Sequence, residues 1–473
     1  MSSRVVVIGG GISGLAAAWA TRAAATRRGE AVEILVLERD TAVGGKARSL
    51  RGDGWLVEGG PSGFLDGRPA LDQLIEAAGL TGDVVPAGLA AKHRYIFRAG
   101  QLRRVAPSPV GLVREGLLSV GGMFRLLAEP FVPRRRGDED ETVWAFAARR
   151  LGVQAADRLV SPMALGIFAG DARRLSLGSA FPRMAALEAN YGSLIRGMIA
   201  KRGRTSSGTL KSFRHGMQSL PTALAERGGF QVRCNAEVTA LVRDHEQWQV
   251  VVAGDRESIP VDAVICAGEP WATANLLRSL DADAATALDA IPCPAITVVA
   301  LGYRAADATQ IPSGFGVLIS RKEGIRMLGN LWEMSLYPGR GPDGHVLVRA
   351  MLGGAVDPEA GALAEADALA LVKDEVSRLY HISSPPVFER VVRVPRAIPQ
   401  YELGHRERVA TVERALTRLP GLYATGYGLR GVAFADAATD GVRTGEQAAA
   451  DLSARHDGAS SGSLRTQNAE ALR

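Results

Sequence analysis

The clearest chemical signal lies near the N-terminus, where Gly9, Gly11 and Gly14 form a G-x-G-x-x-G motif. The motif follows the apolar run RVVVI and precedes an alanine-rich stretch, so it stands between an expected strand and an expected helix. Glycines at this spacing let the backbone approach a pyrophosphate, and the helix N-terminus around Ser13 offers free N–H groups to the phosphates. The spacing therefore predicts a dinucleotide-binding turn.

An acidic side chain stands where such a dinucleotide needs a partner for its ribose. A second apolar run, EILVLE, ends at Glu38, which is 24 residues after Gly14. A carboxylate at this point accepts hydrogen bonds from ribose hydroxyls and disfavours a 2′-phosphate. Strand, motif, helix, strand and acid in one register predict a βαβ unit at the start of the chain.

The residues after Glu38 favour FAD over NAD as the dinucleotide. Arg39 is followed by a second glycine pair, Gly44 and Gly45, and then by Lys46. Glycines and basic residues so soon after the ribose acid suit a ligand that continues beyond the pyrophosphate, as FAD does. In this position the stretch resembles the GG-doublet motif of the FAD-dependent amine oxidase superfamily.

A second G-x-G-x-x-G, at Gly426, Gly428 and Gly431, does not indicate a second dinucleotide site, because too little chain follows for a full βαβ unit. The segment resembles the C-terminal flavin motif of the same superfamily, which brings backbone N–H groups to the flavin ring. The residues that this resemblance places there are Gly426, Gly431, Val432 and Ala433. Without an NAD(P) site, oxygen or a quinone is the expected electron acceptor.

The remaining reactive side chains predict neither a metal site nor a protein nucleophile. The three cysteines are far apart, and the seven histidines show no HxxxH or HxH spacing. No metal is therefore expected. The chemistry should belong to the cofactor, with the protein supplying position and electrostatics.

Several stretches between the two flavin motifs resemble sequences of the protoporphyrinogen oxidase family, whose members are oxygen-dependent FAD enzymes. These stretches are EGGPSGF (58–64), KHRY (92–95), GIFAGD (166–171), FGVL (315–318), MLGG (351–354) and IPQY (398–401). The resemblance implies oxidation of protoporphyrinogen IX to protoporphyrin IX, with oxygen as acceptor, in haem and tetrapyrrole biosynthesis. Oxidation of coproporphyrinogen III to coproporphyrin III, or a flavin amine oxidase or desaturase activity, are the alternatives.

The resemblance also implies roles for individual substrate-site residues. Arg94 would pair with a substrate propionate, which a guanidinium binds bidentately. Leu318, Leu331 and Met351 match the apolar positions that enclose a pyrrole ring, although core packing is the other reading of such residues. Gly166 matches the glycine whose backbone carbonyl faces the reacting macrocycle, and it is the one expected catalytic position.

Two positions depart from the family pattern. Ser62 is expected to contact substrate, although its side chain is shorter than the Asn that the family often has there. Tyr427 stands where the family usually has Asn. The other residues expected to contact the cofactor are Gly60, Pro61 and Val238.

The composition is that of a globular protein. The chain has 473 residues, 47% of them apolar and 22% charged, with a net charge of +6 from dispersed basic residues. Nucleic acid is therefore not an expected partner. The sequence shows neither a secretory signal nor an apolar run long enough to cross a bilayer, so we expect a cytoplasmic protein.

The expected fold combines α/β and α+β parts. It has a discontinuous Rossmann-type FAD-binding domain, a substrate domain with a mixed or antiparallel sheet, and a helical insert. The FAD-binding parts are 1–85, 211–280 and 411–455, the substrate parts are 86–110 and 281–410, the insert is 111–210, and the tail 456–473 should be disordered.

One apolar helix face is predicted within the insert, from Val113, Leu117, Val120, Phe124 and Leu127. Core packing is the first interpretation of this face. The alternative is peripheral contact with the cytoplasmic face of the inner membrane, which the nearby Arg134–Arg136 would favour. A homodimer is a further expectation.

Overall fold

The first sheet follows from the apolar runs around the glycine motif. The computed structural model describes residues 2–135, 137, 139–201, 208–245 and 247–470. Five parallel strands form this sheet in the order β10-β2-β1-β14-β20. They are β1 (Ser3–Ile8), β2 (Val32–Leu37), β10 (Gln231–Arg233), β14 (Ala263–Cys266) and β20 (Leu422–Ala424). Because both faces are covered, the central valines of β1 are fully buried. The predicted Rossmann-type fold is confirmed, with strands drawn from three separate stretches of chain.

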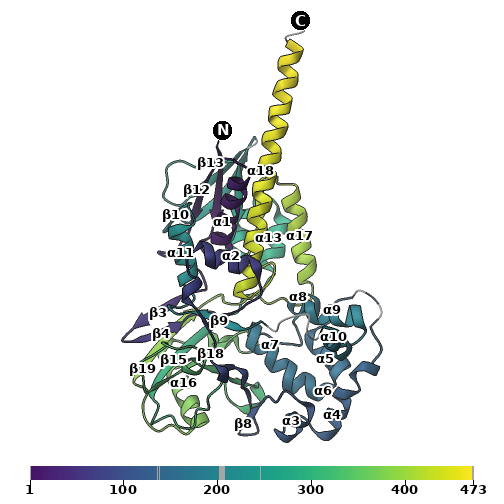
Figure 1. Cartoon of the computed structure of the whole chain (residues 1–473), viewed down its shortest axis with the longest axis vertical. Helices are drawn as coiled ribbons and strands as arrows, with labels where there is room; N and C mark the ends of the chain where they lie inside the picture. Colours follow the sequence, from purple (N-terminus) through teal and green to yellow (C-terminus); the bar gives the residue numbers. More distant parts are fainter. Residues whose placement is uncertain (1, 136, 138, 202–207, 246, 471–473) are drawn as a thin grey trace.

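Two helices from opposite ends of the chain cover one side of this sheet (Figure 1). They are α1 (Ile12–Arg27) and α18 (Phe434–Glu470). A Cβ on Gly441 would overlap the carbonyl oxygen of Ser13, and one on Gly445 would overlap that of Ala17. The two helix backbones therefore touch, and glycine is required at both points.

Smaller sheets and helices surround the dinucleotide-binding unit. They are the hairpin β3 (Ser49–Gly52) and β4 (Trp55–Glu58), the sheet β5 (Phe64–Leu65), β9 (Leu210–Phe213) and β6 (Val84–Pro86), the sheet β11 (Val238–Asp244), β12 (Gln247–Val252) and β13 (Ile259–Val261), and the helices α2 (Pro69–Ala77), α11 (Ser219–Arg227), α12 (Pro270–Leu277), α13 (Ala282–Asp289) and α17 (His405–Thr417). Among them, strands β4 and β6 pack on the rest of the molecule, through Trp55 and Val85.

The second large sheet has seven strands in the order β19-β15-β18-β17-β16-β7-β8. They are β7 (Arg94–Arg98), β8 (Gln101–Arg104), β15 (Ile296–Arg304), β16 (Gly316–Ile319), β17 (Gly329–Trp332), β18 (His345–Gly353) and β19 (Phe388–Val394). Only β16 and β7 pair in parallel within this order, so the sheet is mixed, as predicted. One face packs on α16 (Glu365–Tyr380) through Val317, Trp332 and Val348. The alternate residues of these strands therefore face the other way.

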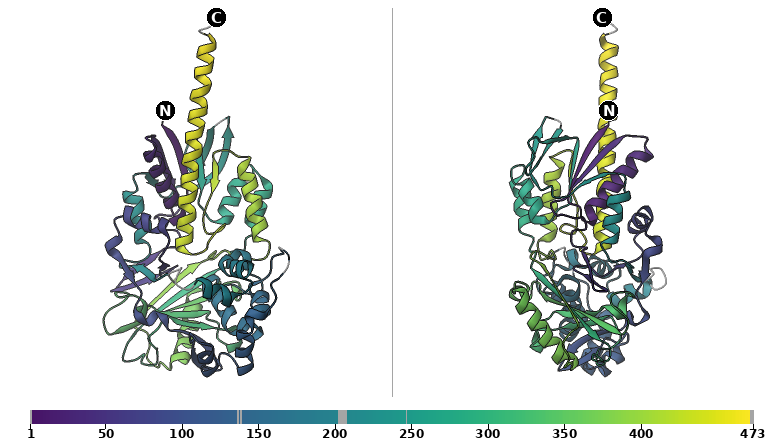
Figure 2. Two further views of the ribbon diagram at one scale, coloured as in Figure 1. Left: turned by 45° about the vertical axis from the view of Figure 1, so that its right-hand side comes forward. Right: turned by 90° about the vertical axis from the view of Figure 1, so that its left-hand side faces the viewer.

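Between β8 and β9 the described chain is mainly helical, and it lies beside the seven-stranded sheet (Figure 2). The helices are α3 (Pro109–Arg114), α4 (Val120–Leu127), α5 (Val143–Leu151), α6 (Val153–Ala155), α7 (Ser161–Phe168), α8 (Leu177–Ala180), α9 (Pro182–Tyr191) and α10 (Leu194–Lys201). A fully buried ion pair between Arg150 and Glu129 ties this region together.

The prediction of one continuous apolar helix face in this region is wrong. α3 ends at Arg114, and Gly116 then adopts φ +71°, which breaks the helix. Ser119 begins α4 by accepting a hydrogen bond from the Gly122 N–H, as an N-cap does. Leu117 is buried, whereas Phe124 is 63% exposed, so the expected stripe divides into a core part and a surface part. Arg136 lies outside the described residues.

The C-terminal helix differs from the composition-based expectation. α18 continues to Glu470 and so includes residues 456–470, which the composition predicts to be disordered. The segment has no proline that would end a helix. Residues 471–473 lie outside the described part. None of the described helices is both long and apolar enough to cross a membrane.

Candidate functional site

The turn between β1 and α1 has the geometry that the first glycine motif predicts. Gly9 adopts φ +112°, and a Cβ on Gly14 would overlap the Gly9 carbonyl oxygen. A Cβ on Gly11 would meet no atom within 4 Å, so open space lies above the N-terminus of α1. Gly11 is the N-cap, and no side chain caps the helix. The turn therefore has room, and free N–H groups, for a dinucleotide pyrophosphate.

Glu38 lies against this turn rather than at a distance from it. Its Oε2 accepts a 2.6 Å hydrogen bond from the Gly10 N–H, and its Oε1 accepts one from the Asp40 N–H. The carboxylate is buried, with only 7% of the residue exposed. Its expected contact with a ribose remains a prediction. The Ala236 N–H donates to the Glu38 carbonyl, so Val238 follows closely along a segment attached to this acid.

The GG doublet packs directly on the first glycine turn. The Gly44 N–H donates to the Gly10 carbonyl at 2.9 Å, and a Cβ on Gly45 would lie 3.3 Å from the Gly11 Cα. Both doublet glycines have positive φ values of +125° and +55°. Two glycine segments predicted independently to bind one cofactor are thus in contact.

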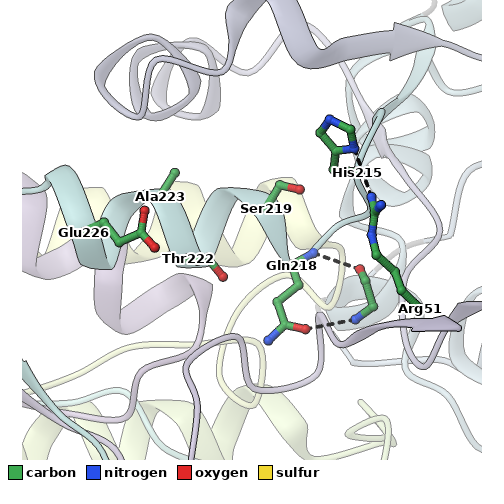
Figure 3. Close-up of a pocket in the computed structure, with 8 residues that line it drawn as sticks. Arg51, His215, Gln218, Ser219, Thr222, Ala223 and Glu226 are labelled. Carbon is green, nitrogen blue, oxygen red and sulfur yellow. Dashed lines mark hydrogen bonds between the residues drawn. The ribbon is translucent and has the colours of Figure 1, made fainter. Parts of the chain in front are cut away.

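A groove of about 300 Å³ is lined by Gln218, His215 and Arg51 (Figure 3), and the Gln218 side chain lies against Gly44 of the GG doublet. Gln218 closes one side: its Nε2 donates to the Val43 carbonyl, and it exchanges hydrogen bonds with Ser49. Arg51 donates to His215 Nδ1 at 3.0 Å in the same groove. None of the predicted cofactor residues lines it, and Gln218 connects its described lining to the GG doublet, through Val43 and Gly44.

Lys46 and Arg39 have partners that the sequence did not indicate. The Lys46 Nζ lies 3.0 Å from Glu269 Oε1, and the Tyr427 hydroxyl donates to Glu269 Oε2 at 2.5 Å. Glu269 therefore joins the GG doublet to the C-terminal glycine turn. The guanidinium of Arg39 lies 4.9 Å from the centre of the Trp271 ring.

The C-terminal turn meets the start of α1. A Cβ on Gly426 would lie 3.7 Å from Ser13 Oγ, and Gly426 has φ +118°. Its N–H donates to Asp440 Oδ2 at 3.1 Å. Gly431 also has positive φ, +69°, and Val432 and Ala433 lead into α18. The turn therefore lies where a flavin motif would need it, beside the dinucleotide turn.

Two buried aromatic side chains contact the backbone carbonyls of this turn. The Tyr401 hydroxyl donates to the Tyr427 carbonyl, and His405 Nε2 lies 3.1 Å from the Leu429 carbonyl oxygen. The rings of Tyr401 and His405 stack with centroids 4.0 Å apart. Burial lowers the pKa of His405 to about 4, so the imidazole is neutral at physiological pH.

The residues expected to enclose a pyrrole ring share one face of the seven-stranded sheet. In one cross-strand row, Arg94 pairs with Gly316, Gly316 with Leu331, and Leu331 with Arg349. In the next row, Leu318 pairs with Gly329 and Gly329 with Met351. Cross-strand partners, and residues two apart in a strand, point to the same side of a sheet. Leu318, Leu331 and Met351 therefore lie on the face away from α16.

Gly166 of α7 approaches this face from the helical region. A Cβ on Gly166 would lie 2.9 Å from a methyl carbon of Leu318, so the helix backbone and the sheet face nearly touch. Gly166 is exposed, as is Arg94, whose guanidinium lies 5.1 Å from the Phe315 ring centre. The structure thus brings together the predicted catalytic glycine and the predicted apolar residues.

The Ser62 side chain is hydrogen-bonded to both members of a buried ion pair. The hydroxyl donates to Glu333 Oε1 at 2.7 Å and accepts from Arg349 Nη2 at 2.5 Å. Glu333 and Arg349 are 1% and 3% exposed. Sequence reasoning missed both charged residues, although an arginine within the apolar run HVLVRAML was a signal for a buried ion pair.

The loop from Glu58 to Ser62 is packed between the GG doublet segment and the seven-stranded sheet. A Cβ on Gly60 would overlap the Lys46 carbonyl oxygen, and Pro61 follows at the same point. The Glu58 carboxylate accepts from Arg340 Nη1 at 3.0 Å. Burial nevertheless raises the pKa of Glu58 above its ordinary value.

Among the described residues, no group of three or more His, Cys, Asp or Glu side chains has an arrangement that could hold a metal ion. The open space above Gly11 and the meeting of three glycine segments fit an extended dinucleotide. The residues that would hold it are therefore those of the two glycine turns and the GG doublet.

Comparisons with known proteins agree with this geometry. The family model described as flavin containing amine oxidoreductase matches residues 12–453. A protoporphyrinogen oxidase of Oryza sativa chloroplasts is 30% identical, over 92% of this chain and 85% of its own. A coproporphyrinogen III oxidase of Bacillus subtilis is 28% identical, over 92% and 96%. A crystal structure assigned as a protoporphyrinogen oxidase from Exiguobacterium superposes with a TM-score of 0.82, covering 96% and 99% of the two chains at 22% identity, which supports the fold.

Proposed function

The chain belongs to the flavin containing amine oxidoreductase family, and from this premise we propose that it oxidises a porphyrinogen to a porphyrin. The family match confirms that the enzyme is an FAD-dependent oxidoreductase, as the glycine motifs predict. Relatives named protoporphyrinogen oxidase and coproporphyrinogen III oxidase support this class of substrate. Protoporphyrinogen IX is the first candidate, with oxygen as acceptor, and coproporphyrinogen III is the second.

One observation carries the proposal: the sheet face with Leu318, Leu331 and Met351 in adjacent rows, opposite Gly166. A porphyrinogen is a wide, largely apolar ring with carboxylates at its edge, and an apolar sheet face suits such a ring. Arg94 lies at one end of a row, exposed, where it would pair with a propionate.

The cofactor would be held by the parts 1–85, 211–280 and 411–455, through Gly9–Gly14, the GG doublet and the turn at Gly426. Bound FAD supplies the oxidation itself, taking two electrons at a time and passing them to oxygen. The residues of this chain would orient the ring. The proton lost from a pyrrole nitrogen would leave to solvent or to a neighbouring porphyrinogen nitrogen.

The direct test follows the flavin itself. The purified enzyme is mixed without air with protoporphyrinogen IX or, in a parallel experiment, coproporphyrinogen III, and flavin bleaching is followed by stopped-flow absorbance. We expect protoporphyrinogen to bleach the flavin faster. In air, porphyrin fluorescence and hydrogen peroxide should appear together. A flavin that neither substrate reduces, although dithionite reduces it, would refute the proposal.

We also propose that the enzyme contacts a membrane surface through its helical region. Three apolar side chains there are unusually exposed: Val110 by 69%, Phe124 by 63% and Phe131 by 82%. Arg114 and Arg134 are exposed nearby. Apolar side chains flanked by cations suit an anionic lipid interface.

A further inference from the structure

Arg349 reaches from the sheet face to the loop at Glu58–Ser62, and its guanidinium has four acceptors. Its Nε donates to Glu333 Oε1 at 2.7 Å, and its Nη1 donates to the carbonyl oxygens of Glu58 and Gly60, both at 3.0 Å. Its Nη2 donates to Ser62 Oγ at 2.5 Å. Three of the four acceptors belong to one loop. The planar fork of a guanidinium is suited to hold them together.

The loop that Arg349 holds is itself pressed against the GG doublet segment. The backbone of Gly60 contacts the Lys46 carbonyl so closely that no Cβ would fit. A second contact, from Ser212 Oγ to the Ser62 carbonyl at 2.8 Å, holds the far end of the loop. Any change in the position of this loop would therefore reach the segment that is expected to carry FAD.

At its other end, Arg349 belongs to the expected substrate face. It is the cross-strand partner of Leu331, and Met351 lies two residues further along β18, about 7 Å away. Arg349 therefore connects the loop directly to the strand that carries Met351 and to the cross-strand neighbour Leu331.

We propose that Arg349 is a positioning residue, which sets the distance between the flavin-side loop 58–62 and the sheet face that receives the substrate. This inference rests on the proposed function, because it assumes that both surfaces serve one reaction. Glu333 neutralises the buried guanidinium, and its Oε2 has no hydrogen-bond partner among the described residues. Arg349 thus acts as a fixed bridge and does not bind a substrate carboxylate.

The chain offers a matched control for the energetic effect of any buried arginine. Arg150 is also completely buried, and its guanidinium also binds carboxylates, those of Glu129 and Glu188, together with the carbonyls of Val132 and Gly192. All these partners lie in the helical region, away from the loop 58–62. Loss of the fork at Arg150 should lower stability without moving the loop.

The test compares Arg349→Lys with Arg150→Lys as FAD-loaded enzymes. Lysine keeps the charge but cannot hold four acceptors in fork geometry. We expect both variants to melt at a lower temperature. Only Arg349→Lys should change the visible absorbance of the bound flavin, and its limiting rate of flavin reduction should fall by about tenfold or more, because misplacement by a fraction of an ångström is costly. Its apparent substrate Kd should change little.

A second pair of variants keeps the inference testable if Arg349→Lys does not fold. Ser62→Ala removes one acceptor of the bridge, and Glu333→Gln removes the charge that neutralises Arg349; each should shift the flavin absorbance in the same direction. A flavin spectrum and reduction rate like those of the wild type, or like those of Arg150→Lys, would overturn the inference. If no porphyrinogen reduces the wild-type flavin, the proposed function fails, and the spectral comparison still decides the role of Arg349.

Discussion

At the scale of single residues, the candidate site depends on ionisable groups that burial keeps neutral or paired. His405 is an example, because it is 2% exposed and supports the C-terminal turn through Leu429. Its pKa falls to about 4, mainly through burial, and the neighbouring Arg408 lowers it further, while Leu429, Asp140 and Glu407 oppose the fall. Protonation of this ring would place a charge beside the candidate flavin turn.

We expect the stability of the folded protein to fall in acid because His405 is buried as a neutral ring. Unfolded His405 takes up a proton near pH 6.5, but the folded ring does so only near pH 4. The contribution of neutral His405 to the free energy of unfolding is therefore complete above the unfolded pKa. It is lost as the pH falls from the unfolded to the folded pKa, and the loss is roughly 3 kcal/mol at most. Thermal unfolding of wild type and His405→Gln at about pH 7.5 and about pH 5 measures it. The variant should lose less stability on acidification.

The control is His245→Gln, since that side chain is 97% exposed. Equal pH slopes of stability in wild type and His405→Gln would contradict the assignment.

Individual contacts were the least predictable part of the site. The glycine motifs indicated which residues would turn, because spacing and flanking strands constrain the backbone. They did not indicate that Lys46 would pair with Glu269 or that the Ser62 hydroxyl would meet Glu333 and Arg349. Such partners are brought together only by tertiary packing of segments more than 200 residues apart.

At the scale of elements, the packing of α1 on α18 has the strictest steric requirement. Gly441 and Gly445 have no room for a side chain, and the Thr21 hydroxyl also donates to the Gly445 carbonyl at 3.2 Å. α1 begins at the dinucleotide turn, so its axis sets the direction of the N–H groups that would meet the phosphates.

Gly445→Ala should therefore weaken both stability and cofactor retention. Overpacking of this kind typically costs about 1–3 kcal/mol, and here the obstacle is backbone rather than a flexible side chain. Denaturant unfolding and the temperature at which flavin fluorescence is released measure the two effects. Gly121→Ala in α4 is the control, because its nearest atom would be 3.9 Å away. A Gly445→Ala protein that releases flavin at the wild-type temperature would contradict this account.

Elements were predicted well where a motif and a hydrophobic period agreed. The five-stranded parallel sheet and the mixed sheet follow from short apolar runs bounded by turn residues. The single helix over Val113–Leu127 was wrong, because apolar spacing alone does not reveal Gly116 in a left-handed conformation or the cap at Ser119. Periodicity predicts a face, and capping decides where the helix ends.

At the scale of the whole molecule, the helical region, which lies beside the seven-stranded sheet (Figure 1), carries exposed apolar side chains such as Phe124 and Phe131. Substituting Phe124→Ser and Phe131→Ser together should weaken binding to anionic phospholipid vesicles, measured by flotation, by roughly a hundredfold or more, because each buried aromatic contributes about 2 kcal/mol at an interface. Flavin reduction by dissolved porphyrinogen should be unchanged. The control is Val242→Ser, on a side chain that is 50% exposed in the other half of the molecule. Undiminished flotation of the double variant would remove the membrane proposal.

The first sheet also bears on how the protein is made. Its edge strand β20 and the glycine turn that follows lie more than 400 residues after Gly9, yet they complete the surroundings of the turn that begins there. A polypeptide still attached to the ribosome lacks them. Capture of the cofactor should therefore wait until residues 422–431 have been synthesised, and until then the first strands of the nascent chain have to be kept from aggregating without the flavin's help.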